Sequence, residues 1–328
     1  MSSSSLRLSL HLLADARHKL VALQVSPVGA VTADDPPYAD LAGVCAIFPC
    51  LVAAADAARL PPALLESMIA AGCKVAAEGA MGVLEKADAP PQPPKATYLG
   101  GDWYLRPQGK PGASQTSSRT LALKLAQLIA SDAETHVIED VFRIEPTLAY
   151  NLMRLVNSPG IGSGRRIDNF AQAIMMLGRR QLRRWLNLIL FSSQKGDPRS
   201  AMLLAHVAVR ARMLEQLARE VGYDKEGQDR AFMVGMFSLL GVMFGMPLAE
   251  VLQPLKLDPE LNAALLGREG EMGHLLKAVE AIEQGDPAQA LALLDALLPA
   301  VIDLDPLLID AHVWMLALIR ESGEGAHG

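Results

Sequence analysis

Cysteines and long apolar runs are scarce in this sequence. Its 328 residues include three cysteines, Cys45, Cys50 and Cys73, and an odd number cannot pair fully within one chain. Neither Cys45 nor Cys50 has a histidine or third cysteine nearby at a zinc-like spacing, so we expect buried, unreactive thiols in a cytoplasmic protein. No stretch approaches the roughly 20 apolar residues of a membrane span. The N-terminal apolar run is broken by His11 and Asp15 and lacks a signal-peptide cleavage site, so we expect no membrane association.

Aromatic residues and net positive charge are also lacking. Aromatic side chains make up 5% of the chain, apolar residues 51%, and the formal net charge is −6. This charge argues against a general attraction of the whole protein to nucleic acid or to an anionic membrane. The abundance of Leu, Ala and Met favours helices over strands, and the length suggests two domains.

The first part of the chain alternates short apolar runs with a helical segment. Residues 18–27, 43–52, 74–80 and 98–107 are predicted to be strands, and residues 62–72 a helix ended by Gly72. Strands that alternate with helices predict a small α/β domain over residues 1–110. Proline- and glycine-rich stretches at 86–96 and 110–118 are interpreted as linkers.

The rest of the chain has a helical pattern. Residues 199–222 are predicted to form a long amphipathic helix, and residues 229–247 are almost wholly apolar and therefore expected in the core. We predict a helical domain over residues 117–320, followed by a disordered tail at 321–328. The fold class is therefore mainly α, a helical bundle preceded by a small α/β domain.

A glycine-rich stretch, NSPGIGSGRR, occupies residues 157–166. Phosphate-binding loops of this kind follow a strand, whereas this stretch follows a predicted helix and lacks the Lys-Ser/Thr pair of a P-loop. We therefore favour a connection between two helices. The alternative is anion binding by Arg165 and Arg166.

Arginines are concentrated between residues 143 and 184. This segment has eight arginines, no lysine and two acids, Glu145 and Asp168, which gives a local charge of +6. A candidate surface for an anion or a partner consists of Arg165, Arg166, Arg180, Arg183 and Arg184. The alternative is a solvated helix face whose arginines pair with acids from elsewhere in the fold.

Two segments of the helical part resemble a known family. EPTLAYNLMRLVNSPG at residues 145–160 and IDNFAQAIMMLGRRQLRRWL at 167–186 are similar to the HDOD domain, the HD-related output domain of bacterial signalling proteins. The likeness extends over residues 117–320 and to the subgroup that carries an EAL-type domain in front. It implies an HD-like helical bundle that acts in signal transduction.

The catalytic residues of the related HD phosphohydrolases are missing at the matching positions. Those enzymes bind metals through histidines and a His-Asp pair, which activate water. The resemblance places Ser238 and Leu239 where that pair would lie. It thus implies a protein without catalytic residues, metal or cofactor, and we predict that it is not an enzyme.

The front part resembles a truncated, degenerate EAL domain. Leu23 or Gln24 stands where that family has its motif glutamate, and Ala77 and Glu78 stand where it has paired aspartates. About 110 residues cannot form a complete (β/α)₈ barrel, which takes ~200 or more. A flavodoxin-like or receiver-like fold is the alternative.

Three functions follow from these observations. The preferred hypothesis is a non-enzymatic bacterial regulatory module that acts through a protein partner, and the Ala- and Met-rich helices are also compatible with a homodimer. The second is a non-catalytic binder of a cyclic dinucleotide or nucleic acid through the arginine surface. The third, an enzyme based on metal or thiol chemistry, lacks suitably placed His and Asp residues.

Overall fold

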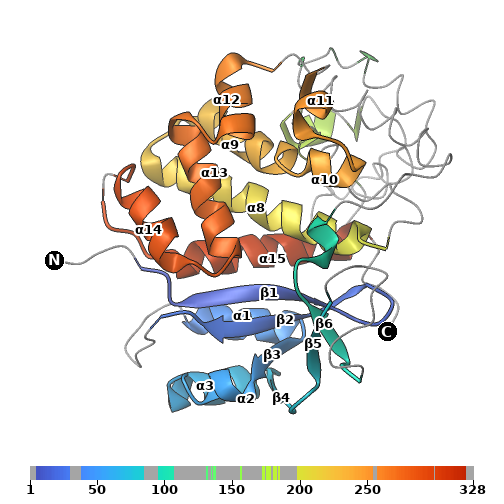
Figure 1. Ribbon diagram of the computed structural model, residues 1–328, viewed down its shortest axis with the longest axis vertical. Helices are drawn as coiled ribbons and strands as arrows, with labels where there is room; N and C mark the ends of the chain where they lie inside the picture. The colour runs from blue at the N-terminus through green and yellow to red at the C-terminus, as the bar shows by residue number, and fades with distance from the viewer. Residues whose placement is uncertain are drawn as a thin grey trace.

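A mixed β-sheet lies beneath a layer of helices in the computed structural model (Figure 1). The structure describes residues 5–29, 38–84, 95–106, 198–253, 257–298 and 300–322, together with isolated positions between 131 and 184. Most of the described helices come from the second half of the chain, in agreement with a mainly α fold. None of the described helices is long and apolar enough to cross a bilayer.

The sheet has six strands in the order β4-β3-β2-β1-β6-β5. Its centre is an antiparallel hairpin of β1 (Leu8–Ala14) and β2 (Leu20–Pro27). On one side, β3 (Cys50–Ala53) and β4 (Lys74–Ala76) continue parallel to β2. On the other, β6 (Tyr98–Gly100) runs antiparallel to β1 and pairs in parallel with β5 (Met81–Val83).

Several predicted elements of this region need correction. The predicted strand 43–52 is wrong in its first part, because α1 (Tyr38–Ile47) covers it and only β3 is extended. A short apolar run cannot be assigned to helix or strand by periodicity alone. The predicted strands 74–80 and 98–107 are shorter than expected, and a 3₁₀ turn, η1 (Trp103–Leu105), follows β6. The strand β1 was missed.

The helix predicted at residues 62–72 is confirmed as α3 (Pro62–Ala70). Pro62 occupies the first turn, where its missing N–H costs nothing. Gly72 follows the helix with a φ of 107°, a conformation that favours glycine. A short helix, α2 (Ala54–Ala57), joins β3 to this segment.

The second half is built around α8 (Ser200–Val221), which agrees with the predicted helix 199–222. The apolar stretch 229–247 is divided between α9 (Lys225–Phe237) and α10 (Leu240–Phe244). Asp224 begins α9, because its side chain accepts a hydrogen bond from the Gly227 amide at 2.8 Å. The remaining helices are α11 (Leu248–Leu252), α12 (Pro259–Gly267), α13 (Gly270–Glu283), α14 (Pro287–Asp295) and α15 (Asp305–Ser322).

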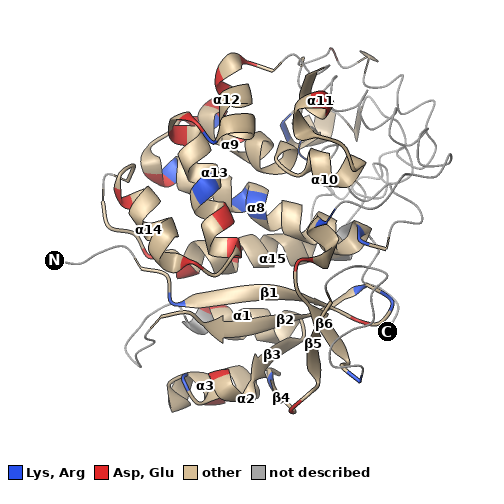
Figure 2. Cartoon of the chain, viewed as in Figure 1, with Lys and Arg blue, Asp and Glu red and all other residues tan. Residues whose placement is uncertain are grey.

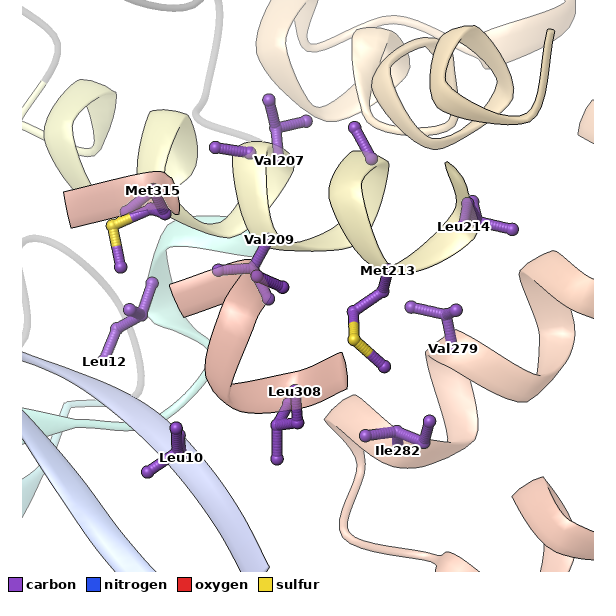
Figure 3. Packing of buried hydrophobic residues seen from close by; sticks show 14 of the residues in the cluster. Leu10, Leu12, Val207, Val209, Met213, Leu214, Val279, Ile282, Leu308 and Met315 are labelled. Atoms are coloured by element: carbon purple, nitrogen blue, oxygen red, sulfur yellow. The ribbon is translucent and has the colours of Figure 1, made fainter. Parts of the chain in front are cut away.

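One hydrophobic core joins the sheet to the helices. Figure 3 shows Leu10 and Leu12 of β1 facing Leu308 and Met315 of α15, with side chains of α8 and α13 beyond them. A fully buried Leu or Met stabilises the fold by about 1.5–3 kcal/mol. The predicted domain boundary at residues 110–117 lies outside the described residues, as does most of the predicted tail.

An ion pair connects the start of β1 to the start of α15. Arg7 Nε donates to Asp305 Oδ2 at 2.9 Å, and its Nη2 donates to Asp303. Asp305 Oδ1 also accepts the Arg7 and Leu8 amides at 3.0 and 3.1 Å. Burial lowers the pKa of Arg7, but the bonds to the two aspartates outweigh this effect and raise it. The carboxylate of Asp305 is fully buried, and this burial raises its pKa although the bonds from Arg7 and Leu8 act to lower it.

Candidate functional site

Four buried polar side chains and a largely buried glutamate meet where the sheet region (β1 to η1) contacts the helices. Together they form what we call the core network: Tyr104 of η1, His206 and Arg210 of α8, Ser238 after α9, and Glu283 of α13. His206 and Arg210 are one helical turn apart and therefore project from the same face of α8. Four segments thus contribute to one polar cluster inside an apolar core.

The centre of the core network is the ion pair between Arg210 and Glu283. Arg210 Nε donates to Glu283 Oε1 at 2.8 Å, and Nη2 donates to Oε2, so the pair is bidentate. Arg210 Nη1 donates to Ser238 Oγ at 2.9 Å, and that hydroxyl donates to the Gly235 carbonyl at 2.7 Å. Burial raises the pKa of Glu283, but Arg210 and His206 outweigh it and lower this pKa to about 2.

Tyr104 connects the sheet region to this ion pair. Its hydroxyl lies 3.2 Å from His206 Nδ1, and His206 Nε2 lies 3.3 Å from Glu283 Oε2. Burial raises the pKa of Tyr104, so the phenol keeps its proton. His206 Nε2 also lies 3.4 Å from Arg210 Nη2. The result is a chain of hydrogen bonds from η1 to α13.

Further contacts fix η1 against α8. The buried Arg199 donates from Nη1 to the Arg106 carbonyl. Trp103 is buried and meets Tyr104 edge-to-face, with ring centroids 5.6 Å apart. The turn between β1 and β2 reaches the same place, because the His18 ring lies 4.8 Å from that of Trp103. These contacts hold Trp103 and Tyr104 of η1 next to the first half of α8.

The described cluster does not suit a metal ion. No set of three or more His, Cys, Asp or Glu side chains that could hold a metal was found among the described residues. Ser238, at the position of the His-Asp pair in the resemblance, instead accepts a hydrogen bond from Arg210. A guanidinium is permanently charged and cannot act as a ligand. The chemistry that the core network offers is a buried ion pair with a histidine beside it.

The structure describes two of the five arginines of the predicted anion or partner surface. Arg184 donates from Nη2 to Asp229 at 2.8 Å and to Glu215, and its guanidinium lies 4.7 Å from the centre of the Phe232 ring. Its side chain is 13% exposed. Arg180 Nε lies 4.0 Å from Asp229.

Both described arginines thus have acidic partners. Arg165, Arg166 and Arg183 lie outside the described residues, so the proposed surface stays a prediction. Figure 2 shows basic residues on α8 next to basic and acidic residues on α13. Arg210 of α8 pairs with Glu283 of α13.

Sequence reasoning missed the core network as a unit. It did not connect His206 and Arg210 with Glu283. The available signal was His206 and Arg210, two large polar residues one turn apart in the otherwise apolar segment 202–211. The partners, 73 residues away in the case of Glu283, are adjacent only in the fold.

Comparison with known proteins identifies the class of domain. Residues 117–266 match the model of the HDOD domain, so this part of the chain is an HDOD domain, as the resemblance indicated. The chain is 30% identical over 143 residues to the protein YuxH of Bacillus subtilis, an alignment that covers 43% of this chain and 34% of YuxH.

A second relative is CdgJ of Vibrio cholerae, named a cyclic di-GMP phosphodiesterase. It is 26% identical over 194 residues, which cover 58% of this chain and 44% of CdgJ. The chain thus aligns with less than half the length of either relative. A solved structure from Shewanella amazonensis, named as a phosphohydrolase, matches 62% of this chain and 91% of its own. At 16% identity and a TM-score of 0.38, it is too distant to support an inference.

Two predictions change with these comparisons. The prediction that the protein is not an enzyme is wrong by this comparison, because a relative that aligns with 58% of the chain is named a phosphodiesterase. The missing His-Asp pair excludes only the metal-dependent mechanism of the HD phosphohydrolases. The prediction wrongly extended this exclusion to every enzymatic activity. The HDOD match begins at residue 117, and no comparison supports an EAL-like front part.

Proposed function

We propose that this protein is a signal-transduction protein whose HDOD domain acts on a protein partner under the control of the sheet region. The observation that carries the proposal is the core network. Tyr104 is a side chain of the sheet region, yet it hydrogen-bonds into an ion pair that otherwise belongs to the helices. A shift of the sheet region would therefore change the environment of a buried charge, which is a sensitive way to transmit a signal.

The proposed signalling system is that of cyclic di-GMP. The name of CdgJ supports this choice, and the alignment with CdgJ is longer than the HDOD match alone. In the same proposal, the front part descends from an EAL-type barrel. Its curled sheet, with β2, β3 and β4 parallel, is compatible with a fragment of such a barrel.

The test compares the wild-type chain with Tyr104→Phe. Both tagged full-length proteins are used to capture partners from the source cells, and the binding of each purified partner is then measured directly. We expect at least one partner whose affinity differs several-fold between the two proteins, because the substitution removes only the link into the core network. Equal affinities for every partner would refute control by the sheet region.

A second candidate function is hydrolysis of cyclic di-GMP, which the name of CdgJ favours. The full chain is incubated with cyclic di-GMP and Mn²⁺ or Mg²⁺, and the linear dinucleotide is measured by chromatography. An EDTA-treated sample and Arg210→Met are the controls. Metal-dependent turnover by the wild type would establish the activity, and its loss in the variant would assign it to the region of the core network. Product at the level of the EDTA control would eliminate this candidate.

A further inference from the structure

The helical part contains a cavity that the core network does not use. Its volume is about 310 Å³, which is at the lower end of the range for ligand pockets. It lies between the residues that begin α9, the first turn of α12 and the start of α13. Its lining residues other than Met272 fall within the part of the chain that matches the HDOD domain.

One part of the lining is apolar. Leu261 and Met272 are buried side chains, and Tyr223 between α8 and α9 is half-buried. Such a surface suits the methylene groups of a long side chain better than a fully hydrated ion. The cavity can therefore take a ligand that is apolar along part of its length.

The rest of the lining has an excess of negative charge. Three acids, Asp224, Glu226 and Glu260, line the cavity together with one base, Arg230. The Asp224 carboxylate is occupied by the Gly227 amide at 2.8 Å, and Glu226 pairs with Arg230 at 3.3 Å. In the described part of the chain, no hydrogen bond or ion pair involves the Glu260 carboxylate. The negative charge of Glu260 is therefore available to a ligand.

A second carboxylate lies beside the half-buried tyrosine. The Tyr223 hydroxyl donates to Glu271 Oε2 at 2.9 Å. Burial, this bond and the charges of Glu271 and Glu260 raise the pKa of Tyr223 to about 12, so the phenol stays neutral. A neutral tyrosine ring attracts a cation to its face, and nearby carboxylates add to this attraction.

We propose that the cavity binds an arginine side chain of the protein partner, an inference that rests on the proposed function for the existence of that partner. Among the described residues, no set of His, Cys, Asp and Glu side chains suits a metal ion, which favours an organic cation. The guanidinium stacks on Tyr223 and donates to Glu260 and Glu271, because its planar group has five donors and can serve two carboxylates. Its methylene groups lie against Leu261 and Met272.

The cavity shares two helices with the core network. Its walls come from the starts of α9 and α13, whereas Ser238 follows the end of α9 and Glu283 is the last residue of α13. At about 1.5 Å per residue, the cavity and the core network are roughly 16 Å apart along each helix. A partner held in the cavity therefore contacts the same helices that meet Arg210 at their other ends.

Nuclear magnetic resonance of the full chain tests this assignment with two small probes. The protein is isotopically labelled in its methionine methyl groups, and the Met272 signal is identified by its absence in Met272→Leu, a conservative change. The probes are the N-acetyl methylamides of arginine and of citrulline, which has nearly the same shape but no charge. We expect the arginine probe to shift the Met272 signal with a dissociation constant on the order of 1 mM, because one side chain makes few contacts. The citrulline probe should leave this signal in place.

Matched variants assign the charge. Glu260→Gln is expected to weaken binding of the arginine probe several-fold, whereas Glu78→Gln, which removes an exposed charge between β4 and β5, leaves it unchanged. The comparison of the two probes on the wild type is decisive even if a variant does not fold.

Three results would overturn the proposal: no saturable shift of Met272 by about 50 mM arginine probe, equal shifts with both probes, or equal binding by Glu260→Gln. None of them bears on control by the sheet region, which is tested separately with Tyr104→Phe. Failure of the arginine cavity and failure of the proposed function can therefore be told apart.

Discussion

Replacement of Glu283 by Gln tests the ion pair at the centre of the core network. The substitution preserves the shape of the side chain but removes the negative charge that faces Arg210. Arg210 is buried, with its side chain 6% exposed, and it would keep only the more distant Glu280, 3.7 Å from its Nη1, as a counter-charge. Removal of one partner from a buried ion pair typically costs about 3–5 kcal/mol.

The lowered pKa of Glu283 gives an independent value for the stability that the ion pair contributes. It falls from 4.5 to about 2 on folding, which corresponds to about 3 kcal/mol of stability near neutral pH. Because the folded pKa is the lower one, this contribution is present above pH 4.5 and is lost as the pH falls toward 2. Both approaches therefore give a cost of about 3 kcal/mol at pH 7.

Urea unfolding followed by circular dichroism measures this cost. The matched control is Glu226→Gln, which removes one partner of the Arg230–Glu226 pair at 3.3 Å on the surface of α9, where the glutamate side chain is 76% exposed. Exposed pairs of this kind contribute about 0–1 kcal/mol. A loss in Glu283→Gln no larger than that in Glu226→Gln would refute the assigned role of the ion pair. A difference that persists unchanged at pH 3 would refute its electrostatic origin.

Three further predictions concern other buried polar groups. Burial lowers the pKa of His312 to about 4, so the folded protein should lose up to about 3 kcal/mol between pH 6.5 and 4, and His312→Gln should flatten this dependence in urea unfolding. Tyr104→Phe leaves His206 Nδ1 without its hydrogen-bond partner and should cost about 1–2 kcal/mol in the same assay, whereas no change would contradict the bond. Asp305→Asn removes one of the two charges that face Arg7 and should lower the melting temperature measured by calorimetry; an unchanged melting temperature would show that the pair does not stabilise the fold.

The helices were easier to predict from the sequence than the strands. Helix α3 was found because Pro62 and Gly72 mark its two ends, and α8 because its apolar residues repeat with a helical period. The strand β1 was missed although LSLHL at residues 8–12 alternates apolar and polar side chains, because this N-terminal run was considered only as a signal peptide or membrane segment. The helix α1 was mistaken for a strand because its buried face and its length do not distinguish the two.

The candidate site could not be predicted, because its pairs are set by the fold. The arginine count gave a local charge of +6, but Arg184 meets Glu215 and Asp229 from α8 and α9. The charge count over residues 143–184 includes the arginines but not their acidic partners, which lie later in the chain. The same reason explains why Arg210 attracted no notice, although its neighbours in the fold define the site.

The core network also bears on how the two parts of the protein influence one another. An apolar contact between them can slide with little change in energy, because the hydrophobic effect has no direction. The bond from Tyr104 to His206 does have a direction, and its loss would leave a buried polar atom unpaired next to the Arg210–Glu283 charges. The sheet region therefore has one preferred position on α8. Any ligand or modification that moves the sheet region must supply the free energy of breaking the bond between Tyr104 and His206. In the proposed function, a signal received by the sheet would in this way change the contacts at the centre of the helices.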